Sequence, residues 1–184
     1  DLGTSKTALT VAKVEGENTQ IVYYTEIPSE GIRNSGVFNE SQASGPLAEA
    51  IRQAEAALGI KITQAVVGMP KYPVRQESST GKIDGRGYDT DITTEDIAEL
   101  KRSAQDMYPL ENPNMEAIYG AVAQSFSDGE NFQIIENDII GMTSDVLEGN
   151  FKIFIGKKSP LAKIDTVLRK AGIVAARKYF TADT

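Results

Sequence analysis

Two segments near the start of the chain carry the residue types of β-strands. Residues 7–14 and 20–27 are rich in Thr, Val, Ile and Tyr, and polar residues 15–18 separate them. Branched and aromatic residues on both sides of a short polar turn are typical of a β-hairpin. The pattern therefore predicts two antiparallel strands. A third short strand is expected over 32–39, where glycines interrupt the strand pattern.

The spacing of apolar residues then changes to that of a helix. Apolar side chains recur on one helical face at Leu47, Ile51, Ala54 and Leu58. They predict a helix over 43–58, with Pro46 in its first turn and Gly59 at its end. The next apolar run, residues 65–69, shows no alternation, which predicts a strand covered on both faces.

The character of the chain shifts after Pro70, and this shift predicts a domain boundary. The polar stretch 78–91, rich in Gly and Asp, predicts a loop or a strand with an exposed insertion. Residues 93–96, Thr-Thr-Glu-Asp, have the spacing of a helix capping box. One apolar stripe follows this box: Ile97, Leu100, Ala104 and Met107. Together they predict a second helix.

The remaining elements predict a small unit of sheet and helix. Strand-like runs lie at 116–126, 132–136 and 151–155. A third helix is predicted from Ser159-Pro160 to a stop at Gly172. Its apolar face consists of Leu161, Ile164, Leu168 and Ala171. With one more strand expected over 175–181, the chain is assigned to the α/β class, with α+β character.

Composition excludes several classes of function. The 184 residues include 26 acidic and 19 basic side chains, a formal net charge of -7, which argues against a nucleic-acid partner. The chain contains neither Cys nor His, so disulfides, thiolate metal sites and histidine bases are absent. No run approaches the roughly 20 apolar residues of a membrane span. A cytoplasmic, globular segment is expected.

One motif carries the chemistry of a binding site: Asp1-Leu2-Gly3-Thr4-Ser5-Lys6. Gly3 lets a ligand approach the backbone, and the amides and hydroxyls of Thr4 and Ser5 can hold phosphoryl oxygens. Lys6 can add positive charge, and Asp1 can hold a hydrated Mg²⁺. The same residue types also form ordinary tight turns, so both interpretations stand at this point.

Two other groups of residues are better explained without a ligand. The carboxylates of Glu95, Asp96, Glu99, Glu116 and Asp128 show no spacing that a catalytic or metal site requires, and acids in the first helical turn serve capping. Gly81, Gly85 and Gly87 do not lead directly from a strand into a helix, as a dinucleotide loop would. They predict a surface loop.

The order of these elements resembles the FtsA family of bacterial cell-division proteins, in the actin, Hsp70 and sugar-kinase superfamily. The similar segments are Asp1–Lys6, Ile27–Ile32 with Gly36-Val37, Ala65–Pro70, Ile92–Ile97 and Asn137–Met142. Within 117–128, only Gln124 and Phe126 match the pattern usual in the family. The resemblance is one of order and spacing more than of identity, and it covers nearly the whole chain.

The resemblance implies a domain organisation. Residues 1–70 would be the first part of an actin-like, ribonuclease H-like subdomain called 1A. Residues 71–172 would be the insertion peculiar to FtsA, the SHS2-like subdomain 1C. Residues 173–184 would be the strand returning to subdomain 1A. Both ends of the sequence would then be cut, and subdomain 1A would be incomplete.

The resemblance also implies a function. FtsA binds ATP with Mg²⁺, self-associates, and tethers the FtsZ ring to the inner face of the cytoplasmic membrane at the division site. Here the first phosphate loop would consist of Asp1, Gly3, Thr4, Ser5 and Lys6, with Asp1 holding Mg²⁺ through water. Subdomain 1C would serve self-association and contacts with later division proteins, whereas FtsZ and the membrane would bind downstream segments.

The same resemblance sets an expectation for activity. No catalytic residue is expected in this segment, and the full-length protein would be at most a weak ATPase. The segment alone would be inactive. Two alternatives remain open, a pilus-assembly-type actin-like protein and a sugar kinase of the same superfamily.

Overall fold

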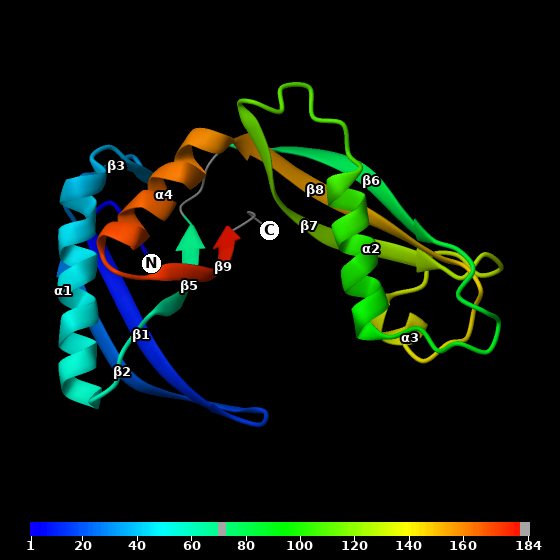
Figure 1. Ribbon diagram of the computed structural model, residues 1–184, viewed down its shortest axis with the longest axis horizontal. Helices are drawn as coiled ribbons and strands as arrows, with labels where there is room; N and C mark the ends of the chain where they lie inside the picture. Colours follow the sequence, from blue (N-terminus) through cyan, green and yellow to red (C-terminus); the bar gives the residue numbers. More distant parts are fainter. Residues whose placement is uncertain (70–72, 181–184) are drawn as a thin grey trace. The chain divides into compact units, whose positions relative to one another are not determined.

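The computed structural model describes residues 1–69 and 73–180, which divide into two units (Figure 1). The first unit consists of Asp1–Tyr72 together with Lys158–Thr184, and the second is the continuous segment Pro73–Lys157. Residue 70, where the sequence pattern predicts a boundary, lies outside the described residues. Residues 181–184 of the expected final strand also lie outside them. Each unit is described by itself.

The first unit opens with the predicted hairpin. Strand β1 (Lys6–Glu15) pairs antiparallel with β2 (Asn18–Pro28) around a turn at Gly16, whose φ is 61°. The register shifts between Val11 and Ala12, so that β2 carries one extra residue there. Apart from the buried Thr7, much of this hairpin is exposed.

The predicted single strand over 32–39 is wrong, because the chain reverses within it. Strands β3 (Ile32–Arg33) and β4 (Gly36–Val37) form a short hairpin. Its two turn residues, Asn34 and Ser35, have φ values of 48° and 60°. Two successive positive values are typical of the turn that matches the twist of paired strands.

Helix α1 (Glu40–Leu58) begins three residues earlier than its apolar stripe predicts. The side chain of Asn39 caps it by accepting a hydrogen bond from the Gln42 amide at 3.1 Å. Pro46 consequently lies inside the helix and not in its first turn. The predicted stop at Gly59 is confirmed, since this residue adopts a left-handed conformation with a φ of 64°.

Two parallel strands and one helix complete the first unit. Strand β5 (Gln64–Met69) pairs with β9 (Val174–Phe180), and helix α4 (Lys158–Lys170) ends before Gly172. The side chain of Val67 is 4% exposed but that of Val66 is 61% exposed, so the prediction of cover on both faces is wrong. One face of β5 is open in this structure.

Helix α4 belongs to the first unit, although the sequence interpretation placed it in the insertion. Its buried side chains are Ile164, Val167 and Leu168. Lys163 donates a hydrogen bond to the Val37 carbonyl at 3.3 Å, and Lys170 donates one to the Ser41 hydroxyl at 3.1 Å. These bonds tie the helix to β4 and to the start of α1.

The second unit is a three-stranded antiparallel sheet with helices on one side (Figure 1). Strand β8 (Leu147–Lys157) lies between β6 (Arg75–Ile83) and β7 (Glu116–Ser127). Helix α2 (Thr94–Asp106) packs its buried residues Ile97, Leu100 and Ala104 into the core. The short helix α3 (Glu136–Ile139) contributes the fully buried Ile139.

Several predictions for this unit need correction. The stretch 78–91 is part of β6 as far as Ile83 and becomes a loop only afterwards, so Gly81 lies in a strand. The run 132–136 is not a strand, because only Ile134 bridges to Phe126 before α3 begins. Met107 is 77% exposed, because it caps the helix end and does not continue the apolar stripe.

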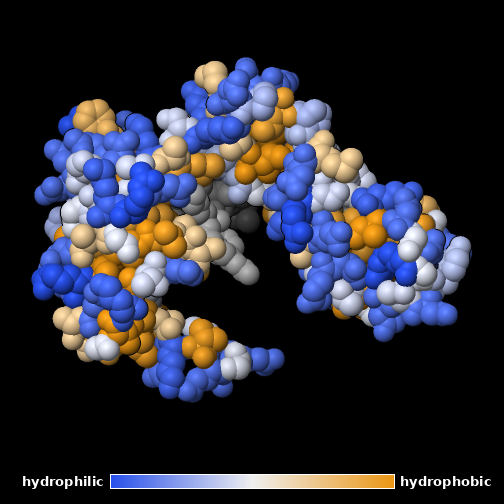
Figure 2. All heavy atoms as spheres, viewed as in Figure 1, coloured by the Kyte–Doolittle hydropathy of each residue, from blue (hydrophilic) through white to orange (hydrophobic). Residues whose placement is uncertain are grey.

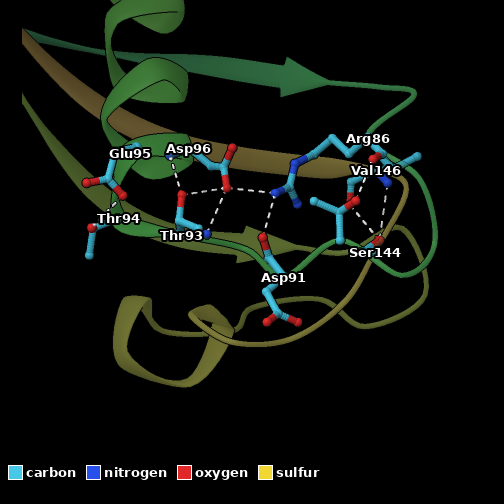
Figure 3. Close-up of polar contacts among 9 residues, drawn as sticks. Arg86, Asp91, Thr93, Thr94, Glu95, Asp96, Ser144 and Val146 are labelled. Carbon is cyan, nitrogen blue, oxygen red and sulfur yellow. Dashed lines mark hydrogen bonds and ion pairs between the residues drawn. The ribbon is translucent and has the colours of Figure 1, made fainter.

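The predicted capping box at the start of α2 is confirmed (Figure 3). The Thr93 hydroxyl accepts from the Asp96 amide at 3.3 Å, and the Thr93 amide donates to the Asp96 carboxylate at 2.7 Å. Arg86 pairs with the same carboxylate at 2.6 Å. Burial would raise the pKa of Asp96, but these partners lower it overall. The acid therefore serves the helix and its flanking loop.

Candidate functional site

The motif at the start of the chain forms a tight turn leading into β1. The Gly3 amide donates to the Lys6 carbonyl at 3.0 Å, and Leu2 bridges to Thr7. A Cβ atom on Gly3 would lie only 2.8 Å from that carbonyl oxygen, closer than real Cβ atoms approach. The glycine is required by the turn itself, before any ligand is considered.

Two backbone amides at the tip of the turn are available. Within residues 1–69 and 73–180, the Thr4 and Ser5 amides have no hydrogen-bond acceptor, and both residues are exposed. The Thr4 hydroxyl oxygen accepts from the Ser35 amide at 2.9 Å, which leaves its own proton for another acceptor. Successive amides with neighbouring hydroxyls are well suited to phosphoryl oxygens.

Lys6 is already engaged by a carboxylate. Its ammonium pairs with one oxygen of Glu26, and the Tyr24 hydroxyl donates to that same oxygen at 2.6 Å. Lys6 and Glu26 face the same side of the β1–β2 hairpin. The hydrogen bond that Lys6 donates to Glu26 raises the pKa of Lys6, and the bonds that Glu26 accepts from Lys6 and then Tyr24 lower the pKa of Glu26. Both side chains are about half exposed.

Asp1 is the one carboxylate of the motif. Its backbone pairs with that of Ala8, through hydrogen bonds of 2.9 Å in each direction. Its Oδ2 atom would be 3.8 Å from a Cβ atom placed on Gly3, so it stays close to the turn. A carboxylate in this position fits a hydrated Mg²⁺. Among the described residues, none of the His, Cys, Asp and Glu side chains form a group of three that could ligate a metal directly.

Structural supports of this turn were missed by sequence reasoning. The Ser5 carbonyl accepts from the Ser29 amide at 3.0 Å, and the buried Thr7 hydroxyl lies 3.0 Å from that of Ser29. Together with the Ser35 amide, these bonds hold the turn from two neighbouring segments. Only the strand register, which pairs Lys6 with Pro28, could have pointed to the Ser29 contacts.

A separate hollow of about 360 Å³ lies in the second unit, beside the loop after β7. Two of its carboxylates are occupied by the protein itself. Asp128 accepts from the Asn131 amide at 2.6 Å, and Asp145 accepts from the Gly87 amide at 2.8 Å. These acids stabilise loops, so the hollow is not the candidate site.

Comparison with known proteins gives relatives for nearly the whole chain. It is similar to cell division protein FtsA of Enterococcus hirae, with 29% identity over 182 residues, and of Streptococcus pneumoniae, with 26% over 173 residues. The FtsA of Bacillus subtilis is 23% identical over 174 residues. These alignments cover 94–98% of this chain but only 37–40% of the relatives' length. No family model matches the chain.

A solved structure shares the fold. It is that of a PilM-PilN type IV pilus biogenesis complex, with a TM-score of 0.53 and 11% sequence identity. The match covers 97% of this chain and 45% of the other. The predicted resemblance to FtsA and the predicted α/β, actin-like fold are thus confirmed. In the described part of the chain, no helix has both the length and the apolarity to cross a bilayer.

Proposed function

We propose that this chain is part of a cell-division scaffold of the FtsA kind. The observation that supports it most directly is the similarity to three FtsA proteins across 94–98% of the chain. Because the chain spans about two fifths of their length, the activities of the whole protein would need further segments. These activities include tethering the FtsZ ring to the inner face of the cytoplasmic membrane and recruiting later division proteins.

Within this proposal, the turn at Asp1–Lys6 is the first phosphate loop of an ATP site. Gly3 allows the tight turn, and the amides and hydroxyls of Thr4 and Ser5 would hold phosphoryl oxygens. Asp1 would orient the water shell of Mg²⁺. The bound nucleotide would supply a γ-phosphate whose presence or loss changes assembly. No residue described here is assigned as a catalytic base.

We assign the first unit to subdomain 1A and the second unit, Pro73–Lys157, to the inserted SHS2-like subdomain 1C. Support comes from the chain path, because the second unit is one continuous segment between β5 and α4. Its surface carries large apolar side chains suited to protein contacts (Figure 2). The exposed side chains of this unit include Met107, Met115, Val122, Phe132 and Ile135. Self-association and contacts with later division proteins are assigned to this unit.

Co-sedimentation of the full-length protein with FtsZ filaments and lipid vesicles, with and without ATP, tests the scaffold function. We expect the protein to pellet with both, and more so with ATP. A full-length protein that sediments with neither overturns the proposal. Sedimentation with a pilus inner-membrane protein instead would favour the pilus-assembly alternative, and phosphorylation of a sugar would favour the kinase.

Binding of fluorescently labelled ATP with Mg²⁺ to the full-length protein tests the phosphate loop. Thr4→Val removes the hydroxyl, and we expect about tenfold weaker binding, in line with one lost hydrogen bond to a charged group. Thr10→Val is the matched control, because Thr10 is an exposed threonine farther along β1. Equal affinity of both variants and the parent protein would exclude the loop from the site.

A further inference from the structure

The cation of the candidate phosphate loop has a competing partner within the hairpin. Lys6 closes the turn with its backbone carbonyl, while its ammonium is held by Glu26. Strand pairing places Glu26 opposite Ala8, two residues beyond Lys6 on the same face. One side chain therefore has two possible anionic partners, a carboxylate on β2 and a phosphoryl group on the loop.

A second donor, the Tyr24 hydroxyl, positions the carboxylate of Glu26 for its contact with Lys6. The Tyr24 hydroxyl donates to the same oxygen that Lys6 contacts, at 2.6 Å. Tyr24 and Glu26 lie two residues apart on one strand, so they share a face of the hairpin. The side chains of Lys6, Tyr24 and Glu26 are all solvent-accessible. The ion pair between Lys6 and Glu26 can therefore open at little cost, because exposed ion pairs contribute about 0–1 kcal/mol.

We infer that Glu26 competes with bound phosphate for the Lys6 ammonium and so sets the nucleotide affinity of the loop. This inference rests on the proposed ATP site. Without nucleotide, Lys6 remains on Glu26. With nucleotide, Lys6 turns to the phosphoryl oxygens, and Glu26 keeps only the Tyr24 hydroxyl. Binding therefore has to break one ion pair before it forms another, which lowers the observed affinity.

The chain offers a matched control for this competition. Lys13 and Glu15 form an ion pair at the other end of the same hairpin, with an N–O distance of 2.6 Å. Glu15→Gln removes the same charge from the same hairpin without touching the loop. Glu26→Gln keeps the shape and the hydrogen-bond acceptor for Tyr24 but weakens the hold on Lys6.

The experiment measures the dissociation constant of fluorescently labelled ATP with Mg²⁺ for full-length variants. We expect Glu26→Gln to bind about two- to fivefold tighter than the parent protein, the range of one exposed ion pair. We expect Glu15→Gln to bind as the parent does. Lys6→Met should bind more weakly than the parent, and adding Glu26→Gln to Lys6→Met should change nothing further.

The outcomes separate this inference from the proposed function. If the parent protein shows no saturable binding, the ATP site itself is wrong, and the inference falls with it. If the parent binds but Glu26→Gln matches Glu15→Gln, only the competition is overturned. It is also overturned if Glu26→Gln tightens binding in the Lys6→Met background, since the effect would then be one of general charge. Circular dichroism spectra confirm that each variant is folded.

Discussion

Arg75 and Glu116 form a two-point ion pair that joins the two outer strands of the second unit. One guanidinium nitrogen contacts Oε1 of Glu116, and the other contacts Oε2 at 3.2 Å. Arg75 lies near the start of β6 and Glu116 at the start of β7, with β8 between them. Paired contacts of this geometry are more favourable than single ones. The pair closes the end of the sheet where the chain enters and leaves.

Glu116→Gln should lower the thermal stability of the chain through this contact. Arg75 also contacts Glu77, but at 3.6 Å and through one nitrogen only. Glu77→Gln removes the same charge next to the same guanidinium and is the control. Thermal unfolding followed by circular dichroism should show a larger decrease in midpoint for Glu116→Gln. Equal midpoints would mean that the two-point geometry contributes nothing beyond charge.

Gly31→Ala should destabilise the first unit by at least about 2 kcal/mol, from backbone strain and overpacking. The φ of Gly31 is 65°, and an added Cβ would lie 2.3 Å from the Asn39 carbonyl oxygen. Gly59 has nearly the same φ, 64°, with no atom near an added Cβ. Gly59→Ala should therefore cost only about 1 kcal/mol, the strain of the left-handed conformation.

Urea unfolding of the two variants separates the steric clash at Gly31 from backbone conformation. The difference between their free energies of unfolding measures the clash alone, because both substitutions carry the same φ penalty. Equal losses would show that the segment around Asn39 moves away without cost.

Gly81→Ala should destabilise the second unit by about 1–3 kcal/mol, because it overpacks the contact between β6 and α2. An added Cβ would lie 2.5 Å from the Leu100 carbonyl oxygen. Gly68→Ala, in β5, is the control, since nothing lies within 4 Å of its added Cβ. Chemical denaturation should show a loss for the first variant only. An unchanged Gly81→Ala protein would contradict the close helix–strand contact.

Acid should weaken helix α1 through Glu49. Hydrogen bonds from Arg52, and then from Gln53, lower the pKa of Glu49 from 4.5 to about 2. A carboxyl with a lowered folded-state pKa contributes stability above its unfolded pKa and loses it as the pH falls through the folded one. The stabilising contribution of Glu49 is therefore complete above pH 4.5 and is lost as the pH falls to about 2.

Glu49→Gln should make the thermal midpoint less dependent on pH over that range. Glu17→Gln removes one carboxyl from the turn of the β1–β2 hairpin and serves as its control. The effect is modest because the Glu49 side chain is 39% exposed and water screens the pair. Parallel pH profiles for Glu49→Gln and the parent protein would contradict the assignment.

Local patterns were sufficient for the elements that contain their own signals. The capping residues Thr93 and Asp96 and the stop at Gly59 lie within a few residues of the helix ends that they specify. The prediction of a single strand over 32–39 was wrong because Asn34 and Ser35 adopt positive φ values and form a turn without glycine. The prediction that both faces of β5 are covered was wrong because the burial of a strand face depends on segments that are far away in the chain.

The candidate site likewise has some features that could be predicted from the sequence and others that could not. The need for a small residue at Gly3 and the polar tip at Thr4 and Ser5 follow from residue type alone. The partners of this turn do not, since Glu26 and Ser35 reach it only through strand register and a second hairpin. From the sequence, Lys6 can add positive charge to the loop, and the folded hairpin gives that charge a carboxylate partner, Glu26.

The pairing of Arg75 with Ile155 has a consequence for how such chains can change over generations. The segment 73–157 starts and finishes on adjacent strands, about 5 Å apart, so its own two ends lie close together. Insertion or exchange at the gene level would likewise leave the β5–β9 pairing intact. The segment can therefore be exchanged as one block, while the hairpin and its turn are retained.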